Sequence, residues 1–181
     1  MSQEAPAAAR LLIESVEYRD FRERFARRQL TACDGSRWKL FDTGRKPSGL
    51  RGWANGTEET STLVCVPGTS GTGASFFLQI LALEKEGYRV VAIECYRAWT
   101  HKAWADGLDL LLDDIGISRC HFYGVSLGGF LLQVFAFRHP EKVISLALTN
   151  AFNDTALFAR NAPCVRGLRY MPEFYLKKYG K

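Results

Sequence analysis

From about residue 60 onward, hydrophobic positions follow two alternating patterns: short continuous apolar runs, and longer segments in which apolar residues recur every three or four positions. The short runs predict buried strands, and the longer period predicts helices with one core-facing side. Strands and helices in alternation are typical of a parallel sheet covered by helices. The predicted strands are 62–66, 89–93, 119–123 and 143–149, and the predicted helices are 74–86, 102–112 and 127–138.

The N-terminal third has a different pattern. Residues 28–33 and 37–42 alternate apolar and polar positions on both sides of Asp34-Gly35, which predicts an antiparallel hairpin. Residues 1–26 begin with a small, Ala-rich stretch and continue with mixed charged and apolar residues. We expect a partly disordered arm there, with a helix and an irregular chain both open for its second half. Residues 43–60 are rich in glycine and polar residues, which predicts a long loop.

Length and composition place the chain among soluble globular proteins of one domain, because 181 residues include 47% hydrophobic and 24% charged positions. The formal net charge is +5. Most of this surplus lies in residues 151–181, which contain six Lys or Arg and two Asp or Glu. The nearly neutral stretch 61–150 argues against nucleic acid as a partner. An acidic protein or lipid headgroups remain open as partners of the basic tail.

The cysteines indicate a reducing compartment. The chain has five of them, at positions 33, 65, 95, 120 and 164, with no Cys-x-x-Cys pair. Cys65, Cys95 and Cys120 are assigned to buried strands, where a thiol behaves as a small core residue. No apolar run has the length of a membrane span, and the acidic N-terminal region is unlike a signal or transit peptide. We therefore expect a cytosolic protein without a metal site or cofactor.

The clearest chemical motif is Gly124-Val125-Ser126-Leu127-Gly128, which joins a predicted strand to a predicted helix. A Gly-x-Ser-x-Gly pattern in this context indicates a nucleophile elbow, a sharp turn that exposes the serine hydroxyl. Gly124 and Gly128 are expected to remove Cβ atoms where the strand and the helix approach each other. Ser126 is therefore the candidate nucleophile, and a merely structural Gly/Ser turn is the alternative.

A second glycine-rich segment, residues 67–73, precedes the helix predicted at 74–86. It lacks the lysine of a P-loop and the spacing of a dinucleotide-binding fingerprint. Beside a nucleophile elbow, such a loop lends a backbone N–H to an oxyanion hole. The predicted donors are the N–H groups of Thr69 and Leu127. A structural turn and a phosphate-binding loop are the other two interpretations.

The order of these elements, with Gly-Val-Ser-Leu-Gly-Gly after the third parallel strand, is similar to the α/β-hydrolase superfamily, and within it the chain resembles the maspardin family. This resemblance implies an α/β-hydrolase fold whose N-terminal part is an antiparallel hairpin leading into a mostly parallel sheet flanked by helices. Residues 27–150 would form an incomplete core, two strands short, and 151–181 the start of the cap region. The stretches that carry the resemblance are 38–44, 70–72, 79–83, 87–90, 124–131, 150–155 and 171–178.

The chain departs from the superfamily in its histidines. A serine triad in this fold follows the order Ser, then Asp or Glu, then His. Of the three histidines, only His139 follows Ser126, and it lies where Pro140 ends a helix. His101 and His121 are likewise expected to be structural, at a helix start and within a strand. Asp154 is a possible acid, although its position favours capping the next helical turn.

The resemblance implies a non-catalytic adaptor or regulatory protein that binds protein partners in the cytosol and at the periphery of endosomal and trans-Golgi membranes. Without a general base the Ser126 hydroxyl is a poor nucleophile, so the chain is predicted to be inactive as given. The alternative is an esterase-like or lipase-like serine hydrolase acting on a small acyl substrate. Its acid and histidine would then lie in a C-terminal half that this sequence does not contain.

Overall fold

The chain forms two compact units, Met1–Ala151 and Phe152–Lys181, and the whole sheet lies in the first. Cys33, Cys95, Cys164, the start of the N-terminal arm, most of the 43–60 loop and nearly all of the predicted cap region lie outside the described residues. The computed structural model describes residues 14–32, 34–44, 61–69, 71–94, 98, 100–154 and 156.

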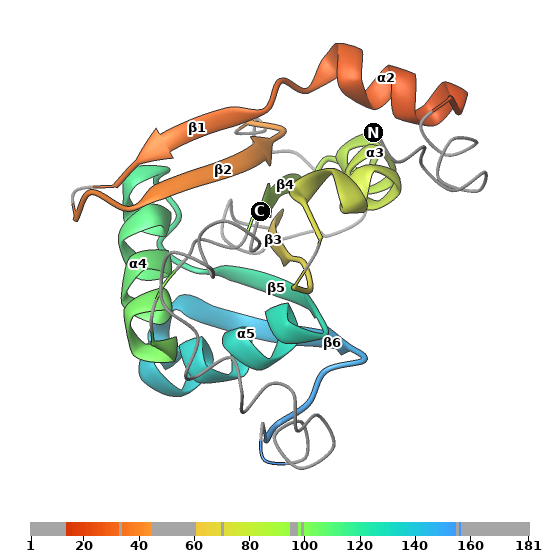
Figure 1. Cartoon of the computed structure of the whole chain (residues 1–181). Coiled ribbons are helices and arrows are strands. Elements are labelled where there is room, and N and C mark those ends of the chain that lie inside the picture. The colour runs from red at the N-terminus through yellow and green to blue at the C-terminus, as the bar shows by residue number, and fades with distance from the viewer. Residues whose placement is uncertain are drawn as a thin grey trace, which may run out of the picture. The chain divides into compact units, whose positions relative to one another are not determined.

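The sheet has six strands in the order β1-β2-β4-β3-β5-β6 (Figure 1). The first two strands pair antiparallel with each other, and β2 pairs antiparallel with β4, whereas all the pairs among β3, β4, β5 and β6 are parallel. The predicted hairpin followed by a parallel sheet is therefore confirmed. The bounds are β1 Arg28–Thr31, β2 Arg37–Asp42, β3 Thr62–Val66, β4 Arg89–Ile93, β5 Cys120–Val125 and β6 Val143–Thr149.

Helices cover both faces of the sheet. Because β4 lies on one side of β3 and β5 on the other, right-handed connections place α3 on one face and α4 and α5 on the opposite face. In agreement, α2 packs on α3 and α4 packs on α5 (Figure 1). The helices are α2 Val16–Arg24, α3 Phe77–Lys85, α4 His101–Asp114 and α5 Leu127–Arg138, with short 3-10 turns η2 at Gly73–Phe76 and η3 at Pro140–Lys142.

The second half of the N-terminal arm forms the helix α2 and not an irregular chain, the other structure that the sequence left open. Ser15 caps this helix, because its hydroxyl accepts a hydrogen bond of 3.1 Å from the Tyr18 N–H. Phe21 is fully buried, with its ring 4.8 Å from Phe41 and 6.3 Å from Phe77. The arm therefore contributes a core side chain that ties the hairpin to α3.

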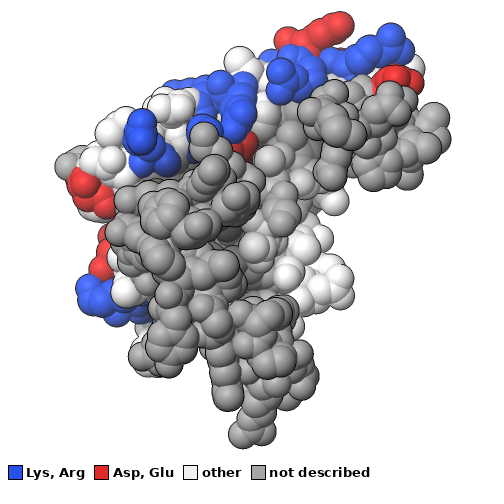
Figure 2. All heavy atoms as spheres, viewed as in Figure 1, with Lys and Arg blue, Asp and Glu red and all other residues white. Residues whose placement is uncertain are grey.

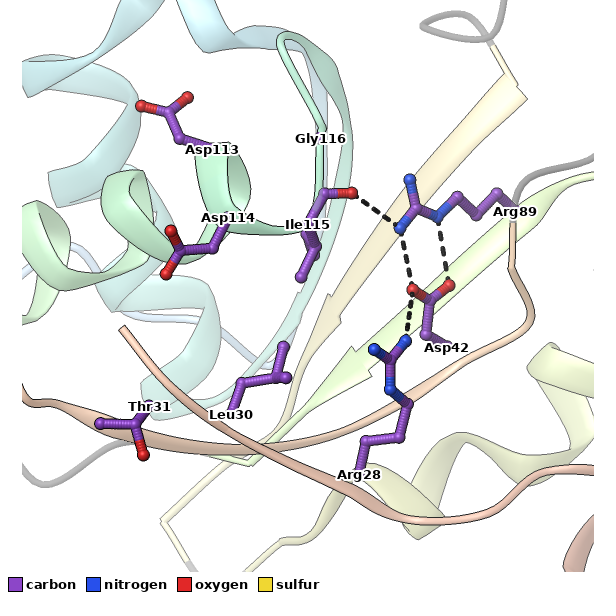
Figure 3. A pocket seen from close by; sticks show the side chains of 9 residues that line it. All are labelled: Arg28, Leu30, Thr31, Asp42, Arg89, Asp113, Asp114, Ile115 and Gly116. Carbon is purple, nitrogen blue, oxygen red and sulfur yellow. Dashed lines mark hydrogen bonds and ion pairs between the residues drawn. The ribbon is translucent and has the colours of Figure 1, made fainter. Parts of the chain in front are cut away.

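A buried ion pair connects the end of the hairpin to the first residue of β4 (Figure 3). The Arg89 guanidinium donates from Nε to Asp42 Oδ1 at 3.1 Å and from Nη2 to Asp42 Oδ2 at 2.8 Å. Its Nη2 also donates to the Ile115 carbonyl at 3.1 Å, just after α4. The two side chains are only 6% and 2% exposed. One guanidinium thus joins the end of β2, the start of β4 and the end of α4.

We predict that Asp42→Ala destabilises the protein by about 3–5 kcal/mol, because it leaves the Arg89 charge buried without its carboxylate. Asp20→Ala is the matched control. Asp20 forms an ion pair with Arg24 at 3.4 Å on α2, and its side chain is 47% exposed. An exposed pair of this kind contributes less than about 1 kcal/mol. Urea unfolding midpoints measure both changes, and equal shifts would contradict the structural role assigned to the buried pair.

Candidate active site

The candidate site lies where the carboxyl ends of three parallel strands meet. Val66 of β3 pairs with Gly124 of β5, and Val125 of β5 pairs with Thr149 of β6. The loop after β3 and the turn after β5 therefore leave the sheet at the same edge. The chain continues from β3 to β4 on one side and later to β5 on the other, and ligands of open α/β sheets bind at such a switch point.

Ser126 has the backbone conformation of a sharp strand-to-helix turn. It is the single residue between β5 and α5, and its φ of 52° with ψ of −118° is one that side-chain-bearing residues rarely adopt. Two hydrogen bonds hold it there: the Ser126 N–H donates to the Thr149 carbonyl at 3.0 Å, and the Ser126 carbonyl accepts from the Phe130 N–H at 3.1 Å. The local geometry is that of the predicted nucleophile elbow.

Three glycines provide the space for this turn. A Cβ on Gly124 would lie 2.6 Å from the Gly129 Cα, and a Cβ on Gly129 would lie 2.6 Å from the Ala151 Cβ. A Cβ on Gly128 would lie 2.5 Å from the Pro67 carbonyl oxygen and closer still to that of Val66. Both glycines of the predicted pair therefore lie where α5 approaches a strand, but each faces a different one. Gly124 and Gly129 form the strand–helix contact, whereas Gly128 makes room for the end of β3.

The glycine-rich loop after β3 lies directly beside the serine. A Cβ on Gly68 would lie 3.2 Å from the Ser126 Cβ and 3.8 Å from its Oγ, so a side chain at this position would cover the hydroxyl. The Gly71 N–H donates to the Gly68 carbonyl at 3.0 Å and closes a turn in the loop. Gly68 is a site residue that sequence reasoning missed, although it belongs to the stretch predicted as an oxyanion loop.

The two predicted oxyanion donors flank these contacts along the chain. Thr69 follows Gly68, and its side chain is exposed. Leu127 follows Ser126 as the first residue of α5, and the first N–H groups of a helix have no acceptor within the helix. The positive end of the helix dipole adds to the attraction for an anion at this point. The assignment of Thr69 and Leu127 to an oxyanion hole stays a prediction that suits these positions.

All three histidines have structural contacts with neighbouring elements. In the described residues, no hydrogen bond joins an imidazole to Ser126. At the end of α5, the two ring nitrogens of His139 lie 3.8 Å from carboxylate oxygens, Nε2 from Asp106 Oδ1 and Nδ1 from Asp109 Oδ1. The individual contacts are the His101 ring edge-on to Phe130 at 4.9 Å, His121 Nδ1 beside Ser145 Oγ at 2.7 Å, and the His139 ring stacked on Phe135 at 5.0 Å.

Asp154, the possible acid, belongs to the second unit. Its Oδ1 accepts a hydrogen bond of 2.8 Å from the Ala156 N–H. A short acidic side chain that accepts from an N–H two residues later is typical of a helix N-cap. The capping role expected from the sequence is thus present, while a role of Asp154 in catalysis stays a prediction.

The two cysteines in the described strands, Cys65 and Cys120, are unreactive. Burial raises the pKa of the Cys65 thiol to about 12. Burial also raises the pKa of the Cys120 thiol, despite the opposing charges of Arg89 and Lys142. Since a thiol reacts as its thiolate, both residues are unreactive core side chains, as their sequence positions predict. The described residues contain no cluster of three or more potential metal ligands.

We predict that Gly128→Val lowers stability by about 1–3 kcal/mol or more, because its side chain would overlap the backbone at the end of β3. Ser126→Ala is the control, since alanine keeps the Cβ and removes only the hydroxyl. It should change stability by no more than about 0.5 kcal/mol. Urea midpoints decide between these expectations. Equal and small shifts would mean that the glycines of the motif do not shape the turn.

Comparison with known proteins reveals relatives that match most of this chain. The chain is 40% identical to maspardin from Rattus norvegicus and from Homo sapiens over 147 residues, which is 80% of this chain and 52% and 44% of those proteins. The chain therefore spans about half the length of the curated relatives it matches. The resemblance to maspardins predicted from the sequence is confirmed. No helix in the described segments has the length and apolar character needed to cross a bilayer.

Solved structures share the fold at low sequence identity. An epoxide hydrolase from Vigna radiata aligns with a TM-score of 0.57 and 19% identity over 70% of this chain and 40% of its own. A bacterial membrane phospholipase A aligns with a TM-score of 0.57 and 21% identity over 80% and 48%. The family model for the alpha/beta hydrolase fold matches residues 61–164, more than half of the sequence, and the chain therefore belongs to the α/β-hydrolase fold family.

Proposed function

We propose that this chain is a non-catalytic binding protein, an adaptor or regulator that keeps the hydrolase scaffold and uses it to engage protein partners. The observation that carries the proposal is the placement of the three histidines. Each is held by a side chain from a helix or strand and none bonds to Ser126 among the described residues. The similarity to maspardins supports the same conclusion.

The chemical reason is the lack of a proton acceptor. A serine hydroxyl attacks a carbonyl efficiently only when a base removes its proton, and in this fold that base is a histidine held by an acid. His139 is the one histidine that follows Ser126 in the sequence. Its ring is stacked on Phe135 and faces the carboxylates of Asp106 and Asp109. The elbow therefore retains its shape without the group that would activate it.

A serine hydrolase is the second candidate, and the strained backbone of Ser126 favours it. A non-glycine residue in such a conformation costs on the order of 1–3 kcal/mol, and this kind of strain clusters at active sites. Gly68 also places no side chain beside the Ser126 hydroxyl. Under this hypothesis an acid and a histidine from outside this sequence would complete the triad, and the substrate would be a small acyl ester.

The proposed location is the cytosol and the periphery of endosomal or trans-Golgi membranes, as the maspardin resemblance implies. Figure 2 shows Lys and Arg side chains gathered over α2 and the β1–β2 hairpin, interspersed with acidic groups on α2. Arg37 and Lys39 are exposed on one face of β2. This surface suits an acidic protein partner or anionic headgroups.

The first test is hydrolysis of short p-nitrophenyl esters by the purified chain. We expect a rate about 10⁴-fold or more below that of a serine hydrolase with a full triad, because the base is missing. We also expect the same residual rate for Ser126→Ala. Saturable turnover that disappears in Ser126→Ala would overturn the non-catalytic proposal and establish the hydrolase.

A fluorophosphonate probe gives an independent measurement, because it reports the reactivity of the serine rather than turnover. The elbow geometry allows slow labelling of Ser126, which Ser126→Ala should abolish. Gly68→Ala serves as a second variant, since its methyl group would sit beside the Ser126 Cβ and hinder the probe. Labelling that persists in Ser126→Ala would show that another residue reacts.

A further inference from the structure

A cleft of about 690 Å³ lies at the edge of the sheet opposite to Ser126. Arg89 is the first residue of β4, and Gly116 lies shortly before β5, so the cleft adjoins the amino ends of the parallel strands. Its walls come from β1, the end of β2 and the end of α4 (Figure 3). The volume is within the range typical of small-molecule sites.

One wall of the cleft carries an excess of positive charge. Asp42 is held bidentately by Arg89, and its Oδ1 also accepts from the Gly44 N–H at 2.9 Å. Arg28 stands at 3.7 Å from Asp42 Oδ2, and its side chain is 53% exposed. Arg28 and Arg89 thus both face the Asp42 carboxylate, and Arg89 already makes two hydrogen bonds to it. Arg28 can therefore turn its donors to a ligand without leaving Asp42 unpaired.

The opposite wall carries an excess of negative charge. Asp113 and Asp114 end α4, where the helix dipole is also negative. Lys142 pairs with Asp113, but it is shared with Asp109, whose Oδ1 lies 3.3 Å from its Nζ. No ion pair or hydrogen bond joins the Asp114 carboxylate to another residue of the described part of the chain. A carboxylate is thereby left available to a cationic group.

Two apolar side chains lie between the charged walls. Leu30 of β1 and Ile115 after α4 lie between Asp114 and Arg28, with their side chains directed toward one another (Figure 3). An aliphatic chain can cover this apolar surface while its ends reach the two charges, as the stem of a lysine does on protein surfaces. The arrangement thus matches a molecule with an anionic end, an aliphatic middle and a cationic end.

We propose that this cleft binds an aliphatic zwitterion whose carboxylate lies on Arg28 and whose ammonium group lies on Asp114. The guanidinium fork suits a carboxylate, and charge-assisted hydrogen bonds at both ends fix the orientation of the ligand. A free ω-amino acid and the C-terminal lysine of a polypeptide share this chemistry. The site lies away from Ser126 and does not depend on the proposed function of the elbow.

The test is an NMR titration of the ¹⁵N-labelled 181-residue chain with 6-aminohexanoate. We expect saturable shifts of the amide signals of Thr31, Ile115 and Gly116, which line the cleft. Hexanoate and hexylamine, each with only one of the two charges, should bind about tenfold more weakly or worse. Shorter and longer ω-amino acids then report the spacing between the two charged walls.

Two variants locate the charges. Arg28→Gln and Asp114→Asn should each weaken binding about tenfold, whereas Arg37→Gln and Glu23→Gln, exposed residues outside the cleft, should leave it unchanged. Ser126→Ala should also bind normally. Absence of saturable shifts up to about 10 mM, equal binding of the singly charged analogues, or no effect of both cleft variants would overturn the proposal.

The source of the ligand is determined with acetyl-Ala-Lys bearing a free carboxylate and with its C-terminal amide. Tighter binding of the free acid than of 6-aminohexanoate supports a polypeptide C-terminus as the ligand. Binding of 6-aminohexanoate alone supports a free amino acid. Equal binding of the acid and the amide contradicts the role assigned to Arg28.

Discussion

The architecture around Ser126 depends on a close approach of backbones that leaves no room for side chains. Gly124 meets Gly129 across the β5–α5 turn, and Gly128 meets the carbonyl groups at the end of β3. With these contacts fixed, the one residue between strand and helix has to adopt a positive φ. Hydrogen bonds to β6 and from α5 then hold it in place. The strain at Ser126 is thus a consequence of packing, supported by three strands and one helix.

The two ends of the parallel sheet are stabilised by different interactions. The carboxyl end relies on steric fit among glycines, whereas the amino end relies on the buried pair of Asp42 and Arg89. That pair costs desolvation, but three hydrogen bonds from the guanidinium offset part of this cost and join segments that are distant in the sequence. Because the carboxylate is already occupied, the nearby Arg28 stays available at the surface. The structural pair of Asp42 and Arg89 thereby leaves Arg28 as a charged group on the wall of the cleft, where a ligand can reach it.

Sequence reasoning predicted the features that depend on short-range pattern. The strands, the helices and the turn at Ser126 follow from periodicity and from glycine spacing within a few residues. It missed Arg89 with Asp42, which are 47 residues apart, because an ion pair between distant segments leaves no local pattern. It also missed Gly68, whose role depends on the register of β3 against β5. The burial of Phe21 was not predicted either, because a single buried residue in a charged helix produces no periodic apolar pattern.

The shape of the elbow does not by itself indicate catalysis. Since the glycine contacts and the hydrogen bonds to β6 and from α5 hold Ser126 in its conformation, the strained backbone does not require a base beside the hydroxyl. The shape of the turn is therefore shared by the binding and the hydrolytic hypotheses, and the position of a proton acceptor separates them. In this chain the histidine that follows the serine stacks on Phe135 near the carboxylates of Asp106 and Asp109. Moving its ring toward Ser126 would break those contacts at the end of α5, and the proposal of a binding role rests on this placement.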